Sequence, residues 1–335
     1  MKEALYYKKL KNNIVNCVLC PTNCVIKPNN FGNCGARKNI GGKLYSLVYA
    51  KPISVSIDPI EKKPLYHFLP GSYALSIGTL GCNFHCLHCQ NWEMSQAKAD
   101  EFIGKEVEPK ELIKEAIKNN CKSISYTYNE PTIFYEYVLE TAKLARKKGI
   151  KNTMVTNGYI NKEPLKELYP LIDAANIDLK ALDEDFYKKI CSVRLKPVLE
   201  SIKEIKKMGT WLELTNLIIP GYNDSKEKIE KLVKWVKENV GIKTPLHFSA
   251  FYPTYKMLDA PRTSPETLLK AKEIAIKHGL KYIYLGNTSL PDSGNTYCPK
   301  CNKPLIERGG FQVYKNNIKK NLCPYCNEKI DGIWE

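Results

Sequence analysis

The spacing of its cysteines constrains this 335-residue chain more than any other feature. Eleven of the thirteen cysteines fall into three groups of four, three and four members. Four thiolates can fill every position around a metal, whereas three leave one position open to a ligand. The sequence therefore predicts two closed metal sites and one open site. The groups are Cys17, Cys20, Cys24 and Cys34; Cys82, Cys86 and Cys89; and Cys298, Cys301, Cys323 and Cys326.

In an intracellular chain, thirteen cysteines indicate metal or redox chemistry rather than disulfides. The N-terminus lacks the apolar stretch of a secretion signal. Residues 68–92 carry no Asp, Glu, Lys or Arg, but they include Pro70 and several polar residues, which argues against a membrane span. We therefore expect a cytoplasmic protein. Its 51 basic and 35 acidic residues give a net charge of +16, which favours acidic partners.

The last cysteine group predicts a small zinc-ribbon-like module. Cys298 and Cys301 form one Cys-x2-Cys knuckle, and Cys323 and Cys326 form a second one 21 residues later. A segment of about 40 residues generally needs such a metal to fold. The first group has the spacing Cys-x2-Cys-x3-Cys-x9-Cys. It suits either zinc or an auxiliary iron–sulfur cluster, because both accept four thiolates.

Between the flanking groups, strand-like and helix-like runs alternate, which predicts parallel strands covered by helices. We expect an α/β fold: a partial or full (β/α) barrel over residues 74–295, after a Cys-rich region at 1–73 and before the zinc-ribbon-like module at 296–335. The strand-like runs are residues 73–78, 123–126, 152–156, 174–179, 211–219, 246–250 and 282–285, and the helix-like runs are 108–119, 133–148, 194–208, 225–239 and 264–278.

Unusual polar segments follow several of these strand-like runs. In β/α barrels, the loops at the carboxyl ends of the strands form the site. We therefore expect these segments to meet around one shared site. They are residues 82–89, 129–131, 156–158, 178–180 and 220–223.

The open cysteine group follows the first of these strands. Three thiolates on a four-iron cluster leave one iron without a protein ligand, so that a substrate can bind there. A structural zinc site in which His85 or His88 supplies a fourth ligand is the alternative at this stage. Cys121 and Cys191 stand apart from the groups, and we expect both to be small buried residues.

The Cys82-x3-Cys86-x2-Cys89 segment, in a barrel context, resembles the radical S-adenosylmethionine (radical SAM) superfamily. More narrowly, the chain resembles the pyruvate formate-lyase-activating-enzyme-like group and, within it, the radical SAM enzyme of the AmmeMemoRadiSam system. The resemblance covers nearly the whole chain. It rests on residues 58–68, residues 89–93 and both flanking cysteine groups.

This resemblance implies that Cys82, Cys86 and Cys89 hold a [4Fe–4S] cluster whose fourth iron binds SAM. One electron from the reduced cluster would cleave SAM into methionine and a 5′-deoxyadenosyl radical, which abstracts hydrogen from an undefined substrate. The implied SAM contacts are Asn129 and Glu130 at the amino group, Thr156 and Asn157 at the ribose, Asp178 and Lys180 near the carboxylate, and His88 against adenine.

The chain departs from the family pattern at three points. His88 stands where an aromatic residue usually lies against adenine. Tyr128 and Asn129 replace the paired glycines that precede Glu130 in the amino-group loop. Val155 replaces an aspartate that helps to bind a cation in glycyl-radical activating enzymes.

The sequence thus leads to an oxidoreductase of the radical SAM class, with two alternatives. One is an activating enzyme for a glycyl radical enzyme. The other, from a different class, is a zinc-dependent nucleic-acid-binding protein, which would bind nucleic acid in a salt-sensitive manner. The resemblance implies a flavodoxin or ferredoxin as low-potential electron donor, and Memo-like and AMMECR-type proteins as partners. Neither a membrane nor nucleic acid is an expected partner of the radical SAM enzyme.

Overall fold

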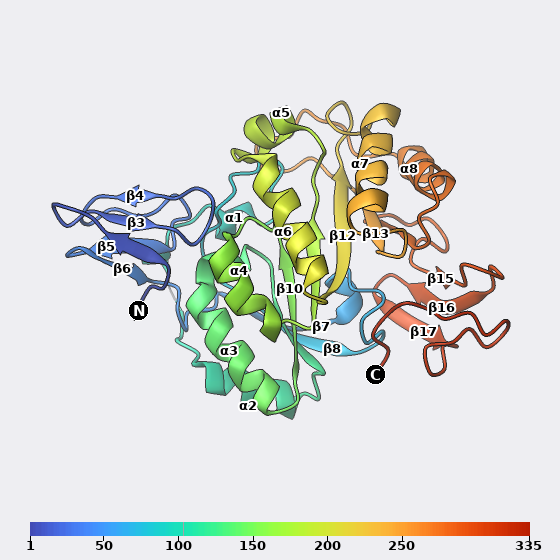
Figure 1. Cartoon of the computed structure of the whole chain (residues 1–335), viewed down its shortest axis with the longest axis horizontal. Coiled ribbons are helices and arrows are strands. Elements are labelled where there is room, and N and C mark those ends of the chain that lie inside the picture. Colours follow the sequence, from blue (N-terminus) through green and yellow to red (C-terminus); the bar gives the residue numbers. More distant parts are fainter. Residues whose placement is uncertain (103) are drawn as a thin grey trace.

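A single eight-stranded sheet organises the centre of the computed structural model, which describes residues 1–102 and 104–335 (Figure 1). The strands lie side by side in the order of the sequence. The first pair is antiparallel, and every later pair is parallel. Among the described residues no ladder joins the last strand to the first, so the sheet is an open, partial barrel. The strands are β7 (Ser54–Pro59), β8 (Tyr73–Gly78), β9 (Ser123–Tyr126), β10 (Lys151–Thr156), β11 (Ala174–Asp178), β12 (Trp211–Ile218), β13 (Leu246–Ala250) and β14 (Ile283–Gly286).

Helices connect the parallel strands, and their first residues suit helix N-termini. Before α2, Glu108 and Glu111 form a reciprocal capping box. The hydroxyls of Ser225 and Ser264 accept bonds from backbone N–H groups in the first turns of α7 and α8. The helices are α1 (Trp92–Ser95), α2 (Pro109–Lys118), α3 (Tyr135–Lys147), α4 (Lys162–Leu168), α5 (Glu184–Phe186), α6 (Leu195–Lys207), α7 (Lys226–Asn239) and α8 (Pro265–Lys277), with 3₁₀ turns at Ile60–Lys62, Ala99–Glu101, Pro131–Phe134 and Tyr169–Leu171 and a π turn at Tyr187–Cys191.

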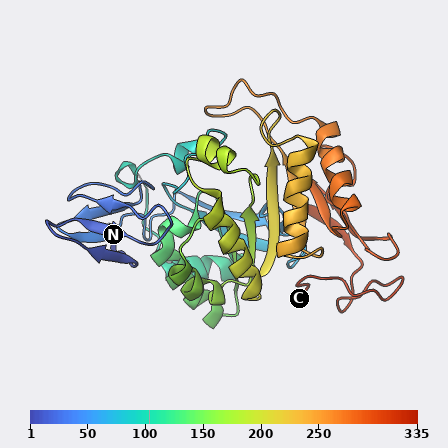
Figure 2. The ribbon, with the colours of Figure 1, turned by 45° about the horizontal axis from the view of Figure 1, so that its top comes forward.

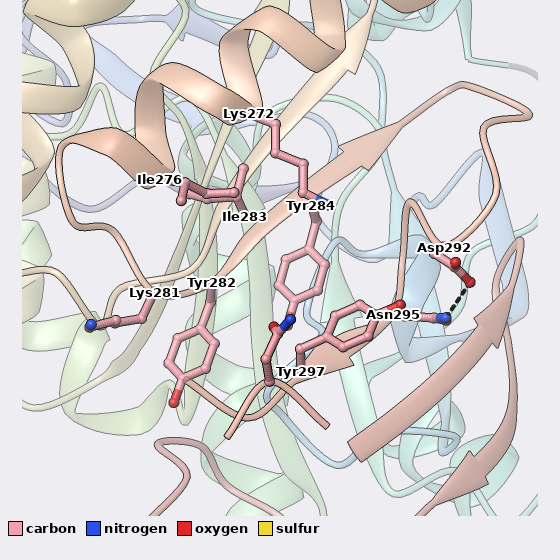
Figure 3. A pocket seen from close by; sticks show the side chains of 10 residues that line it. Lys272, Ile276, Lys281, Tyr282, Ile283, Tyr284, Asp292, Asn295 and Tyr297 are labelled. Atoms are coloured by element: carbon pink, nitrogen blue, oxygen red, sulfur yellow. Dashed lines mark hydrogen bonds between the residues drawn. The ribbon is translucent and has the colours of Figure 1, made fainter. Parts of the chain in front are cut away.

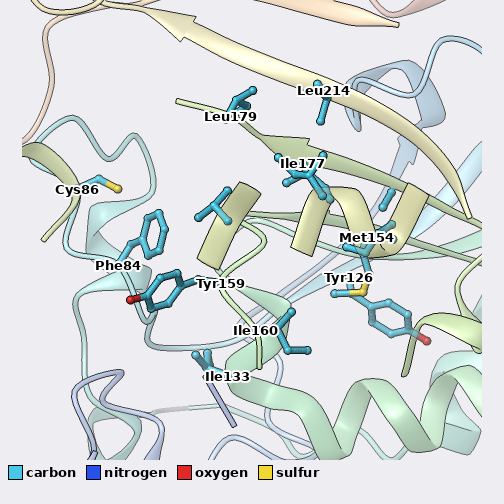
Figure 4. Close-up of a cluster of buried hydrophobic side chains, with 14 of the residues drawn as sticks. Phe84, Cys86, Tyr126, Ile133, Met154, Tyr159, Ile160, Ile177, Leu179 and Leu214 are labelled. Carbon is cyan, nitrogen blue, oxygen red and sulfur yellow. The ribbon is translucent and has the colours of Figure 1, made fainter. Parts of the chain in front are cut away.

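The main core fills the space beside the parallel strands (Figure 4). Ile177 of β11 lies in register with Leu214 of β12, and both side chains are fully buried. All four residues of β9 are buried, as expected for a parallel strand covered on both faces. Apolar packing therefore fixes the strands and, with them, the positions of the loops at their ends.

Small antiparallel sheets lie at opposite sides of the central sheet (Figures 1 and 2). Two of them precede β7, and the third follows β14. They comprise β1 (Lys2–Glu3), β6 (Lys43–Ser46) and β5 (Arg37–Ile40); β2 (Tyr7–Lys9), β3 (Val15–Cys17) and β4 (Val25–Ile26); and β15 (Thr296–Tyr297), β16 (Pro304–Gly309) and β17 (Gln312–Asn316). The predicted α/β architecture, with a cysteine-bearing module near the C-terminus, is confirmed. None of the described helices has the length and apolar character needed to cross a membrane.

Candidate functional site

The loop that carries Cys82, Cys86 and Cys89 leaves the carboxyl end of β8 and is held on two sides. On one side, the backbone N–H of Cys82 donates to the carbonyl oxygen of Cys34 at 3.1 Å. On the other, the N–H of Leu87 donates to the carbonyl of Ile190, in the π turn, at 2.9 Å. The chain thus fixes the loop through backbone hydrogen bonds that do not involve the three thiols.

Gly81 allows the close approach to Cys34. It has a φ of +91°, and a Cβ atom at this position would lie 2.3 Å from the carbonyl oxygen of Cys34. A side chain there would therefore collide with the backbone as well as strain its own conformation. The glycine is required by this contact between the N-terminal region and the cysteine loop.

The three thiols line a cavity of about 550 Å³ at the carboxyl ends of the strands. This volume lies within the usual range for small-molecule sites. Each of the seven other residues predicted to contact SAM lines the same cavity: His88, Asn129, Glu130, Thr156, Asn157, Asp178 and Lys180. The loops come from four neighbouring strands, β8 to β11, as the predicted convergence requires.

One predicted segment, residues 220–223, does not line this cavity. The side-chain amide of Asn223 bonds to backbone groups instead. It donates to the carbonyl of Lys180 at 2.7 Å, and its oxygen accepts from the N–H of Ile219 at 2.6 Å. The expectation that this segment shares the site was wrong, because its polar side chain satisfies backbone groups behind Lys180.

The donor set fits a cluster better than a single ion. Among the described residues, only the C-terminal cysteines form a group of His, Cys, Asp or Glu whose ligand atoms all lie within 4.8 Å of one another. The sulfurs of Cys82, Cys86 and Cys89 therefore do not converge on one small metal ion. A four-iron cluster, in which each thiolate binds a different iron, suits this wider separation.

His88 does not gather with the three cysteines as the fourth ligand of the predicted zinc alternative would, because its ring belongs to no described group of ligand atoms within 4.8 Å of one another. Its side chain is 3% exposed, lines the cavity, and has no hydrogen-bond partner at either ring nitrogen. Burial lowers its pKa to about 3, so the ring is neutral. A buried ring with two unsatisfied nitrogens suits contact with a ligand that is bound in the cavity. The Nδ1–H of His85 instead donates to the Oε1 of Gln96 at 2.6 Å.

Glu130 joins two of the cavity loops. One carboxylate oxygen accepts from the N–H of Thr132 at 2.9 Å and from the hydroxyl of Thr156 at 2.7 Å. The other oxygen accepts from the N–H of Asn157 at 2.8 Å. Burial raises the pKa of Glu130, and the second oxygen, which accepts only one of these bonds, has a lone pair left for a further donor. The site therefore holds a buried acceptor suited to a cationic group.

Asn129 holds the cysteine loop in place. Its amide donates to the carbonyl of Gly81 at 2.8 Å and to the hydroxyl of Thr79 at 3.2 Å, and its oxygen accepts from the N–H of Thr79. These bonds use most of the hydrogen-bonding capacity of the side chain. Asn129 thus positions the loop, whatever it contacts inside the cavity.

Lys180 brings a positive charge next to the thiols. Its ammonium lies 3.1 Å from an oxygen of Asp178. Burial alone would lower its pKa, but Asp178 and the thiols of Cys86 and Cys191 outweigh that effect, and the net shift is upward. The lysine is therefore charged, and it lies beside Asp178 and close to Cys86.

The structure also places at the cavity residues that sequence reasoning missed. Lys62 and Lys63 line it, and both bind Asp58, at 2.8 and 2.7 Å. Ser95 lies 3.1 Å from the sulfur of Cys89. The segment 58–68 stood out in the sequence, but its position beside the cavity depends on the antiparallel pairing of β7 with β8. No sequence signal pointed to Ser95.

The C-terminal cysteines form a compact set, as predicted. The sulfurs of Cys298 and Cys326 are 3.6 Å apart, and those of Cys301 and Cys323 are 3.7 Å apart. A tetrahedral ion with Zn–S bonds of about 2.3 Å holds its sulfurs roughly 3.8 Å apart. The set therefore fits one tetrahedral metal ion.

A second cavity, of about 410 Å³, lies between α8, β14 and the β15 region (Figure 3). Tyr282, Tyr284 and Tyr297 line it, together with Lys272 and Lys281. None of the predicted site residues contributes to it. The three cysteines of the loop and the predicted SAM contacts therefore lie at the first cavity and not at this one.

Comparison with known proteins shows the family to which the chain belongs. The model of the radical SAM superfamily matches residues 76–236. A Methanocaldococcus jannaschii protein provisionally named as a glycyl-radical enzyme activating enzyme is 31% identical over 221 residues, which cover 64% of this chain and 79% of that protein. This chain therefore belongs to the radical SAM superfamily, whose cofactors are SAM and a [4Fe–4S] cluster.

Two further comparisons extend this result. The uncharacterized protein MJ0808 of Methanocaldococcus jannaschii is 49% identical over 335 residues, which cover 99% of this chain and 100% of that protein. The crystal structure of Streptococcus suis SuiB bound to its precursor peptide SuiA has a TM-score of 0.53 at 17% identity and covers 69% of this chain and 52% of SuiB. The likeness to SuiB concerns the fold alone. The nucleic-acid-binding alternative gains no support from these relatives.

Proposed function

We propose that this protein reductively cleaves SAM at a [4Fe–4S] cluster held by Cys82, Cys86 and Cys89, and abstracts hydrogen from a substrate bound in the same cavity. The observation that carries the proposal is that three thiols and seven further predicted contact residues, from four different loops, line one cavity. SAM bound to the reduced cluster supplies a 5′-deoxyadenosyl radical for the hydrogen abstraction.

The residues of the cavity suit the groups of SAM. Glu130, buried with a free lone pair, is placed to accept from the SAM ammonium in a charge-assisted bond. Lys180, charged and beside Asp178, is placed to pair with the SAM carboxylate. We assign the ribose to Thr156 and Asn157, which Glu130 holds in place, and adenine to His88, whose ring nitrogens have no hydrogen-bond partner among the described residues.

Lys62 and Lys63 indicate the charge of the substrate. Both residues line the cavity, and their ammonium groups pair with Asp58, which neutralises part of their charge. Burial lowers the pKa of Lys63 to about 8, so the ammonium stays mostly protonated near pH 7 and can attract an anionic group. We therefore expect the substrate to carry an acidic group.

Activation of a glycyl radical enzyme is the second candidate. The relative named as an activating enzyme favours it. Val155, which lines the cavity, argues against it, because a valine cannot bind the cation that an aspartate would hold there. Binding of a partner peptide that carries the glycine would distinguish this candidate from action on a small molecule.

The remaining parts of the proposal concern the electron donor, the partner proteins, the cellular compartment and the C-terminal metal. A flavodoxin or ferredoxin would supply the electron, and the net charge of +16 would attract such acidic carriers. The AmmeMemoRadiSam resemblance adds Memo-like and AMMECR-type proteins as partners. The thirteen free thiols suit the cytoplasm, and the compact C-terminal set suits zinc.

Anaerobic turnover tests this function. The reconstituted chain is reduced with dithionite, SAM is added, and 5′-deoxyadenosine is quantified by mass spectrometry. We expect product from the wild type and from Cys121→Ala, which removes a buried cysteine outside the cavity, and at least a hundredfold less from Cys86→Ala. A wild-type chain that holds its cluster and forms no 5′-deoxyadenosine would overturn the proposal.

A further inference from the structure

The four N-terminal cysteines surround a cavity of their own. Cys17 ends β3, Cys20 and Cys24 follow in the next loop, and Cys34 precedes β5. Their thiols line this cavity together with apolar side chains that include Leu19, Ile26 and Ile133. Such a lining offers sulfur as the main ligand and excludes water.

The separation of these sulfurs distinguishes the N-terminal set from the C-terminal one. In the C-terminal set, the four sulfurs lie within 4.8 Å of one another, as one tetrahedral ion requires. Over residues 1–102 and 104–335, no three of the N-terminal cysteines meet that criterion. Four thiolates around a cavity at wider separation suit a cubane cluster, whose four irons each take one thiolate.

Two hydrogen-bond donors point at these sulfurs. The backbone N–H of Asn33 donates to the sulfur of Cys24 at 3.4 Å, and the guanidinium of Arg37 donates to that of Cys17 at 3.7 Å. Arg37 is 1% exposed and forms an ion pair with the buried Glu136. Donors of this kind stabilise the negative charge of an iron–sulfur cluster and adjust its reduction potential.

A backbone hydrogen bond joins the N-terminal cysteines to the cysteine loop. The N–H of Cys82 donates to the carbonyl of Cys34, so a ligand of one site touches a ligand of the other. The covalent bonds and the hydrogen bond that connect the sulfurs of Cys82 and Cys34 add up to roughly 14 Å, so these two sulfurs lie no farther apart than that. Asn83, next to Cys82, lines the N-terminal cavity and accepts a bond from Asn157 of the SAM site at 2.8 Å. At such a separation, single electrons tunnel readily between metal centres.

We propose that Cys17, Cys20, Cys24 and Cys34 bind an auxiliary [4Fe–4S] cluster that exchanges single electrons with the cluster at Cys82, Cys86 and Cys89. A low-potential carrier of the flavodoxin or ferredoxin class reduces the auxiliary cluster by one electron. The auxiliary cluster is then reoxidised as that electron passes on, and no bond or proton moves. The relay depends on the proposed radical SAM function, whereas the presence of the cluster does not.

Metal analysis of the full chain tests the cluster without any turnover. The variant Cys82→Ala/Cys86→Ala/Cys89→Ala keeps the N-terminal set, and we expect it to retain about four irons and four sulfides per chain, against about eight of each in the wild type. Adding Cys17→Ser and Cys20→Ser to this triple variant should remove the remaining iron. In contrast, Cys121→Ala in the wild-type chain should leave its iron and sulfide content unchanged.

The wild-type chain decides the question even if a variant fails to fold. About eight irons and one zinc support an auxiliary cluster, whereas about four irons and two zincs would overturn it. Electron paramagnetic resonance of the fully reduced wild type tests the proximity. We expect mutual broadening of the two cluster signals. A spectrum that is the simple sum of two isolated clusters would refute the relay even if SAM cleavage proceeds.

Discussion

Replacing Glu130 by Gln is expected to weaken SAM binding and to lower the free energy of unfolding by a similar amount. The carboxylate accepts from Thr132 N and Thr156 Oγ1 at 2.9 and 2.7 Å, and from Asn157 N at 2.8 Å. An amide keeps one acceptor oxygen, so it can satisfy the first two donors but turns its NH2 toward Asn157. The lost bond to a charged acceptor costs about 1.5–3 kcal/mol of unfolding free energy.

The same change removes the negative charge that would meet the SAM ammonium. A charge-assisted bond of about 1.5–3 kcal/mol corresponds to a roughly 10- to 150-fold rise in Kd. Anaerobic titration calorimetry of the reconstituted protein measures this Kd, and the iron content of each sample shows that the cluster is intact. Denaturant unfolding measures the loss of stability separately.

Glu213→Gln is the matched control. Glu213 is also fully buried and accepts from the N–H groups of Tyr66 and His67 at 3.0 and 2.8 Å, but it lies toward the amino end of β12 and does not line the cavity. We expect Glu213→Gln to lose stability and keep the SAM affinity of the wild type. Equal SAM affinity in Glu130→Gln and Glu213→Gln would refute the role of Glu130.

Three further changes test other parts of the structure. Gly81→Ala places a Cβ 2.3 Å from the Cys34 carbonyl at a φ of +91°, and it should lower the unfolding free energy by about 2 kcal/mol; a change below about 0.5 kcal/mol in denaturant unfolding would contradict this. Burial lowers the pKa of His67 to about 4. As the pH falls below 6.5, the unfolded state therefore takes up a proton at this histidine before the folded state does. Between pH 7 and 5.5, the free energy of unfolding of the wild type should fall by about 1 kcal/mol more than that of His67→Gln. Equal dependence of the two unfolding free energies on pH would exclude the effect. Cys298→Ser should release the zinc of the C-terminal module, as measured by mass spectrometry of the metals, and a variant that retains stoichiometric zinc would show that this set is not the zinc site.

The sequence predicted most of the central sheet because its strands and helices have strong periodic patterns. The strands at residues 123–126 and 246–250 have the predicted bounds. Helix α4 was missed, because its seven residues include Pro164 and present too short a pattern. The small sheets before β7 were missed for a similar reason, since strands of two to four residues show no measurable alternation.

The site was predicted where the chemistry is local in the sequence, and missed where it depends on tertiary pairing. The cysteine loop and the polar residues after β9, β10 and β11 follow strands directly, so parallel pairing was enough to bring them together. The contact between Cys34 and Cys82 joins residues 48 positions apart in the chain. Cys191, expected to be merely buried, packs against the thiol of Cys86 and lowers its pKa. Spacing alone predicts neither contact.

The central claim is that three protein thiolates leave one iron free to bind SAM directly. Electron–nuclear double resonance of the reduced protein, with SAM labelled by ¹⁵N at its amino group, tests this claim most directly. The account predicts a ¹⁵N hyperfine coupling that appears on addition of labelled SAM and is absent in Cys86→Ala. A reduced, fully loaded cluster that binds SAM without any such coupling would contradict it.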